Sequence, residues 1–269
     1  MTDPNGARDD IVHSPHPPLT DYYEKERDRR GWVRRIFDDT ASDYDRMERI
    51  AALGSGSWYR RQALRRAGLK PGMLVLDVGV GTGLVARQAA HILGDPTKVT
   101  GIDPSPGMLR NARVPSGVKL VEGSAEQIPL PDRSVDFLSM GYALRHMADL
   151  SIAFAEFFRV LKPDGRLCIL EITRPEGRIH AALLKGYLGS IVPALAKLTA
   201  RHVDTSLLWH YYWETIETCA SAERVMRTLE SAGFAGVNRH IALGIFSEYR
   251  AHRPGELGGP VASTLARQE

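Results

Sequence analysis

One short stretch near residue 80 constrains the fold of this chain more than any other. The run 74–78 is apolar apart from Asp77, which is the pattern of a short buried strand. Three glycines at alternate positions follow it: Gly79, Gly81 and Gly83. Residues 84–90 then have the composition of a helix. Because glycine has no Cβ and the first helical N–H groups face the turn, the stretch predicts a ligand-binding strand–turn–helix unit.

The spacing of the glycines indicates which ligand to expect. A dinucleotide site needs Gly-x-Gly-x-x-Gly, but Leu84 stands where the third glycine belongs. Residues 99–103 predict a second strand that ends in Asp103, where an acid can bind both hydroxyls of a ribose. A nucleoside with a small charged tail therefore fits better than a phosphate. A nicotinamide or flavin Rossmann unit is the alternative, and Leu84 disfavours it.

These residues resemble a known class of enzymes. The string from Asp77 to Gly83, with Asp103, is similar to the S-adenosylmethionine site of class I methyltransferases. Three further strings resemble the ubiquinone/menaquinone biosynthesis C-methyltransferase family: Phe37-Asp38-x-x-Ala41-x-x-Tyr44-Asp45, Ala143-Leu144-Arg145-His146 against the family's Gly-Leu-Arg-Asn, and Glu171-Ile172-Thr173-Arg174-Pro175. The resemblance covers residues 36–250. It implies S-adenosylmethionine as the cofactor and methyl transfer as the reaction.

The resemblance also implies where the cofactor binds. Tyr44 would lie over the cofactor, and residues 124–126 would line its adenine pocket. The predicted cofactor-binding residues are Tyr44, Asp77, Gly79, Gly81, Thr82, Gly83, Asp103, Met108, Ser124, Ala125, Glu126 and Gly141. From spacing alone, residues 124–126 are equally consistent with an ordinary loop. Tyr44 shares a helical face with Phe37 and Ala41, which by itself indicates packing.

Arg145 and His146 follow the fourth predicted strand and are the predicted catalytic residues. Side chains at the carboxyl ends of parallel strands reach the ligand crevice, and histidine can exchange a proton near neutral pH. A histidine in this place is more often structural, and the resemblance is what favours a role in holding or deprotonating the acceptor. His146 replaces the family's Asn, which leaves the acceptor open. Glu171 is equally consistent with the substrate rim and with a structural ion pair.

Alternating strand and helix patterns predict an α/β fold. We expect a Rossmann-like class I methyltransferase sheet, mostly parallel with an antiparallel edge strand. N-terminal helices precede it, and a helical cover is inserted after the fifth strand. The strands are expected at 73–78, 98–102, 118–121, 135–140 and 166–171, with a last pair within 237–249. The helices between them are expected at 83–92, 105–112 and 148–161.

Composition divides the chain into regions. They are a disordered arm at 1–18, an N-terminal helical segment at 19–71, a methyltransferase domain at 72–250 with its helical cover at 177–219, and a loose tail at 251–269. In the helical segment, the charged run 24–30 and the arginine pairs at 34–35, 60–61 and 65–66 are interpreted as solvated helix faces. The aromatic cluster at 207–213 suits the wall of a flat or isoprenoid substrate, and ordinary core is an equal alternative.

Composition also bears on partners and location. A net charge of +3 over 269 residues gives no reason to expect a nucleic acid partner. The two cysteines, the apolar surroundings of Cys168 and the lack of an N-terminal apolar run predict a cytoplasmic protein. The histidines and cysteines lack the spacing of a metal site, so no metal is expected.

The sequence therefore predicts transfer of a methyl group from S-adenosylmethionine to a lipophilic small molecule, with C-methylation of a quinol ring as the first choice. One alternative is a methyltransferase of secondary metabolism that acts on a prenyl, terpenoid or polyketide acceptor. Another is a non-catalytic subunit that binds S-adenosylmethionine. The choice between C-, O- and N-methylation stays open, and so do a homodimer and a peripheral membrane contact through the apolar cover.

Overall fold

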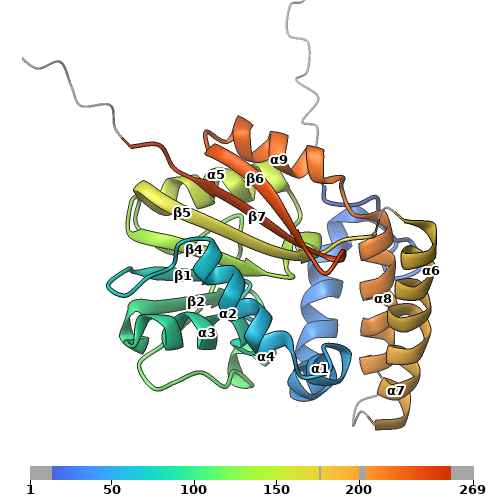
Figure 1. The fold of residues 1–269 in the computed structure, drawn as a ribbon. Helices are drawn as coiled ribbons and strands as arrows, with labels where there is room; N and C mark the ends of the chain where they lie inside the picture. The colour runs from blue at the N-terminus through green and yellow to red at the C-terminus, as the bar shows by residue number, and fades with distance from the viewer. Residues whose placement is uncertain (1–13, 176, 200–203, 256–269) are drawn as a thin grey trace, which may run out of the picture.

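The computed structural model describes residues 14–175, 177–199 and 204–255. Seven strands of these residues form one sheet of order β3-β2-β1-β4-β5-β7-β6 (Figure 1). They are β1 Val75–Val78, β2 Val99–Asp103, β3 Lys119–Glu122, β4 Val135–Gly141, β5 Leu161–Ile172, β6 Ala235–Ala242 and β7 Phe246–His252. Strands β1 to β5 pair in parallel, and β7 runs antiparallel to β5 and β6. The predicted mostly parallel sheet with an antiparallel edge is confirmed.

Helices cover both faces of the sheet (Figure 1). One face carries α2 Gly56–Arg66 and α3 Leu84–Leu93, and the other carries α5 Leu150–Val160 and α9 Ala222–Ser231. Each face has its own buried apolar cluster, with Phe154 and Phe157 of α5 in one and Ala86 and Ala89 of α3 in the other. The predicted N-cap of α9 is present, because the Ser221 hydroxyl accepts from a backbone N–H of the first turn.

A further group of helices completes the molecule. It contains α1 Arg29–Ala51 and, after β5, α6 Arg178–Gly186, the π-helical turn η4 Tyr187–Ile191, α7 Val192–Thr199 and α8 Asp204–Thr218. Figure 1 shows α1 between the sheet and the α6–α8 group, and α1 contacts both α8 and the short helix α4 Pro106–Arg110. Val33, Ile36 and Met47 of α1 pack with Leu208 and Trp209 of α8 in a third apolar cluster. The predicted helical cover therefore packs against the N-terminal helix α1.

None of the helices in the described part of the chain has the length and apolar character needed to cross a membrane.

The chain departs from its predicted pattern in β5. The sequence predicts a turn at residues 163–165 and a strand from residue 166, but β5 already begins at Leu161. Asp164 has a φ of +62° within it. The pairing of β4 with β5 shifts register between Val135 and Phe137, opposite this part of β5, so that the turn chemistry appears as an irregularity within the sheet.

Both ends of the described chain differ from the regions predicted for them. The sequence predicts a disordered arm over 1–18, and residues 1–13 lie outside the described residues. His16, however, is 2% exposed, and the Pro15 carbonyl accepts from the Ala220 N–H at 2.6 Å. At the other end, Ala251 and His252 pair with β5. Residues 14–16 therefore pack against the protein, and 251–252 belong to the sheet instead of the predicted tail.

Candidate functional site

The glycine turn between β1 and α3 faces a cavity of about 390 Å³. Gly79, Gly81 and Gly83 have φ values of +64°, +53° and +89°, which side chains with a Cβ adopt only at a cost. A Cβ on Gly79 would lie 2.7 Å from the Cβ of Ala143, whereas the space beside Gly81 is open. The strand order reverses between β1 and β4, and open α/β sheets bind their ligands at such a point.

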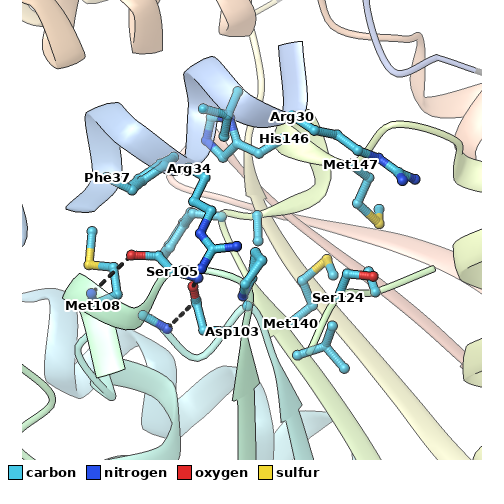
Figure 2. Close-up of a pocket in the computed structure, with 18 of the residues that line it drawn as sticks. Arg30, Arg34, Phe37, Asp103, Ser105, Met108, Ser124, Met140, His146 and Met147 are labelled. Carbon is cyan, nitrogen blue, oxygen red and sulfur yellow. Dashed lines mark hydrogen bonds between the residues drawn. The ribbon is translucent and has the colours of Figure 1, made fainter. Parts of the chain in front are cut away.

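Asp103 ends β2, and backbone groups on both sides hold its carboxylate. The Gly81 N–H donates to Oδ2 and the Ser105 N–H donates to Oδ1, each at 2.8 Å. Burial raises the pKa of this carboxyl to about 6. The side chain lines the cavity (Figure 2), and each of its oxygens keeps a further lone pair. A pair of ribose hydroxyls fits this arrangement.

Most of the predicted site residues line this cavity: Tyr44, Gly79, Gly81, Asp103, Met108, Ser124, Ala125, Glu126, Gly141 and His146. They come from α1 and from the loops after β1, β2, β3 and β4. Glu126 accepts a hydrogen bond from the Ala148 N–H at 2.7 Å. This bond joins the loop after β3 to the chain that leads into α5.

The remaining predicted residues lie outside the lining: Asp77, Thr82, Gly83 and Arg145. Asp77 accepts from the Ser139 hydroxyl of β4 at 2.7 Å, and burial raises its pKa to about 7. The Thr82 hydroxyl donates to Asp45 of α1. Asp77 thus links β1 to β4, and Thr82 links the glycine turn to α1.

Helix α1 supplies cavity residues that the sequence analysis placed on solvated faces. Arg30 and Arg34 line the cavity together with Phe37 (Figure 2). Arg34 donates to Glu122 at 3.0 Å, and the guanidinium of Arg30 lies 3.9 Å from the carboxylate of Glu126. The side chains of Arg30 and Arg34 are 66% and 49% exposed, so the predicted solvated face is present, and the same two side chains also line the cavity.

The sequence contains a signal that places Arg30 and Arg34 at the cavity. The predicted stripe Phe37, Ala41 and Tyr44 follows a helical period, and extending it backward by one and two turns reaches Arg34 and Arg30. The interpretation as a solvated face is wrong for Arg29 and Arg60, which are 1% and 2% exposed. Charged residue type alone did not distinguish a solvated face from a face that lines a cavity.

His146 closes the cavity next to α8. It ends the 3₁₀ turn η3 Leu144–His146. Its ring stacks with those of Tyr211 and Tyr212 at centroid distances of 5.5 and 5.4 Å, and Phe37 meets it edge-on at 5.0 Å. Burial, followed by the charge of Arg145, lowers the pKa of His146 well below 6.5, so that the ring is neutral at pH 7.

The two ring nitrogens of His146 have different surroundings. Nδ1 lies 3.4 Å from the Tyr211 hydroxyl. Nε2 is buried and has no hydrogen-bond partner among the described residues. An unpartnered polar atom in such a place is costly, and a ligand group would relieve that cost.

Arg145 is buried beside the cavity and paired. It donates to the Glu171 carboxylate and, through Nε, to the Thr215 hydroxyl at 3.3 Å. Its backbone carbonyl accepts from Arg29 at 2.8 Å. Burial lowers the pKa of Arg145. Of the two predicted catalytic residues, His146 therefore lines the cavity and Arg145 does not, while Glu171 forms the structural ion pair that the sequence left open.

The cavity fits S-adenosylmethionine. The Asp103 carboxylate has free acceptor capacity, Gly81 leaves open space, and the apolar side chains of Val78, Met108 and Met140 line the same wall. A carboxylate at a strand end beside a glycine-rich turn suits a ribose, and an apolar wall suits a flat base. The fold and the site together define a class I S-adenosylmethionine-dependent methyltransferase.

Comparison with known proteins identifies the family. The model of the ubiE/COQ5 methyltransferase family matches residues 23–253, and the chain belongs to this family. The ubiquinone/menaquinone biosynthesis C-methyltransferase UbiE of Shewanella halifaxensis is 30% identical over 213 residues, which cover 77% of this chain and 84% of the relative. UbiE of Stutzerimonas stutzeri is 29% identical over 265 residues, which cover 94% of this chain and all of the relative.

Solved structures share the fold. A methyltransferase from Thermotoga maritima has a TM-score of 0.57 at 23% identity and covers 81% of this chain and 98% of its own. A methyltransferase from Aquifex aeolicus has a TM-score of 0.55 at 22% identity, and the match covers 77% of this chain and 97% of that protein's chain. The predicted family, the methyltransferase activity and S-adenosylmethionine as the cofactor are confirmed, which decides against a dinucleotide oxidoreductase and against a non-catalytic subunit.

Proposed function

We propose that this enzyme methylates a ring carbon of a quinol, a lipophilic aromatic molecule with two hydroxyls. The observation that carries the proposal is the free Nε2 of His146, neutral and buried among aromatic rings in the cavity that also holds Asp103. Relatives named as ubiquinone/menaquinone C-methyltransferases support it.

The chemistry requires a proton acceptor beside the ring. S-adenosylmethionine, when bound, supplies an electrophilic methyl group on a sulfonium centre. A phenol hydroxyl must release its proton so that electron density reaches the adjacent ring carbon. Nδ1 of His146, beside the Tyr211 hydroxyl, suits the protonated nitrogen, and this leaves Nε2 to accept the phenol proton. The ring carbon gains the methyl group and then loses its hydrogen as a proton, so one proton is released per turnover and the phenol regains its own.

The helices around the cavity keep water from this reaction. Phe37 of α1 and Tyr212 of α8 lie 6.0 Å apart between ring centroids, and the hydroxyls of Tyr44 and Tyr212 are hydrogen bonded at 3.1 Å. These contacts connect α1 to α8 over the cavity. Excluding water protects the reacting groups and strengthens each polar contact inside.

One observation favours a second class of acceptor. His146 stands where the family's string has an Asn, and this changes the polar group beside the reacting ring. A prenyl, terpenoid or polyketide acceptor of secondary metabolism is therefore the second candidate.

A turnover assay distinguishes the quinol from the second class of acceptor. The enzyme would be incubated with S-adenosylmethionine and a chemically reduced demethyl-quinone, and the products would be read by mass spectrometry. We expect a product heavier by one methylene. No product, with cofactor binding demonstrated by calorimetry, would contradict the quinol proposal and favour the second class.

A further inference from the structure

Tyr142 has an unusual backbone conformation at the edge of the cavity. It directly follows β4, and its φ is +61°. The left-handed region is costly for a bulky side chain, and residues held there gather at functional sites. The Tyr142 N–H donates to the Leu170 carbonyl of β5 at 2.8 Å, which fixes the backbone. The residue itself lines the cavity.

The hydroxyl of Tyr142 has no hydrogen-bond partner among the residues that the structure describes. It is not fully enclosed by protein. The other two cavity tyrosines, Tyr44 and Tyr212, differ in this respect because their hydroxyls bond to each other. Tyr142 and His146 Nε2 thus give the cavity two free polar groups from the same connection between β4 and α5.

Buried groups beside Tyr142 hold its ring and affect its hydroxyl. The Arg60 guanidinium lies 5.3 Å from the ring centroid and pairs with Glu48 at 2.5 Å. The ring of Phe246 is 6.5 Å from that of Tyr142. A buried cation over an aromatic face stabilises that arrangement. Burial raises the pKa of Tyr142 to about 12, so the hydroxyl keeps its hydrogen and can donate it.

We infer that Tyr142 is a specificity-determining residue that donates a hydrogen bond to a second oxygen of the acceptor ring. His146 then faces the hydroxyl next to the methylated carbon, and Tyr142 faces the other oxygen. The inference rests on the proposed function and deepens it, because it limits the acceptors to aromatic rings with two oxygens. A site built to hydrogen-bond an oxygen discriminates against the analogue that lacks it.

The test compares two acceptors in the full-length enzyme. One is a prenylated quinol, and the other is its monohydroxy analogue, which keeps only the hydroxyl beside the methylated carbon. We expect the wild type to prefer the quinol by about tenfold in kcat/KM, the equivalent of one hydrogen bond. In Tyr142→Phe, which keeps the ring beside Arg60, activity on the quinol should fall to that on the analogue. The KM for S-adenosylmethionine should not change.

Tyr59→Phe is the matched control. Tyr59 has a buried hydroxyl without a hydrogen-bond partner among the described residues, and its ring lies 4.6 Å from that of Phe246, tilted by 30°. It does not line the cavity, so its variant should keep the tenfold preference. Melting temperatures of both variants would show that the fold is retained.

The possible outcomes distinguish failure of this inference from failure of the proposed function. If Tyr142→Phe keeps the preference for the quinol, or slows both acceptors equally, the inference is wrong and Tyr142 is structural. If the wild type methylates neither acceptor, the proposed function fails and the inference falls with it. Loss of the preference for the quinol in Tyr142→Phe, with the preference retained in Tyr59→Phe, supports both the inference and the proposed function.

Discussion

The two halves of the cavity are built in different ways. In the cofactor half, Gly81 and Asp103 are held by backbone hydrogen bonds within consecutive strand–loop units. In the acceptor half, His146 is held by side chains of α1 and α8 that are far from it in sequence. The first half depends on local turn geometry, whereas the second depends on how separate helices pack. A change of acceptor therefore needs few changes to the first half.

The halves also differ in electrostatics. Burial raises the pKa of the carboxyls on the cofactor side, Asp77 and Asp103. On the acceptor side, burial and a neighbouring guanidinium lower the pKa of His146. The variants below separate these two environments, in order of decreasing effect.

The largest effect should come from Arg145→Met, which leaves Glu171 buried without its ion-pair partner. Breaking a buried pair costs about 3–5 kcal/mol, so the free energy of unfolding should fall by that amount in urea denaturation. Arg27→Met is the control, because Arg27 is 77% exposed and only near Asp28 at 3.9 Å, and it should lose less than about 1 kcal/mol. Equal losses in the two variants would contradict the supporting role of this pair.

His146→Ala should lower kcat by about a hundredfold or more, since a positioned proton acceptor contributes that much. The affinity for S-adenosylmethionine should stay within about twofold, because the cofactor half is independent. His91→Ala, on the exposed side of α3, is the control for loss of a histidine. Full turnover of His146→Ala across neutral pH would remove His146 from the mechanism.

Asp103→Asn should weaken S-adenosylmethionine binding by about tenfold or more, because hydrogen bonds to a charged group are worth about 1.5–3 kcal/mol each. Isothermal titration calorimetry measures this. Asp132→Asn, at an exposed ion pair with Arg159, should bind as the wild type does. Unchanged affinity in Asp103→Asn would refute the ribose role.

The smallest effect should be a pH dependence of the affinity for S-adenosylmethionine. The pKa of Asp103 is raised to about 6 in the free protein, and the ribose hydroxyls bind the ionised carboxylate. Binding therefore competes with protonation, and affinity should fall about fourfold as the pH decreases from about 7 to about 5.5. Burial lowers the pKa of His146, which moves its titration toward lower pH than that of an ordinary histidine. An identical slope in Asp103→Asn would assign the titration to another group.

The sequence by itself determined the cofactor half and the sheet. An apolar run, three glycines and an acid at the next strand end act over a few residues, so their pattern is visible without knowing what packs on them. The strands predicted from periodicity lie where the structure has them, except that β5 begins earlier, before the left-handed Asp164, and that β6 and β7 extend beyond 237–249.

Only the tertiary structure decided the acceptor half. Arg29 and Arg60 have the same residue type as arginines on the surface, and their burial depends on the helices and loops beside them. The pairing of Arg145 with Glu171 and the free hydroxyl of Tyr142 depend on β4, β5 and α2 meeting in space. Spacing along the chain records periodicity, but it does not record which distant elements become neighbours, and those neighbours set the burial and partners of each group.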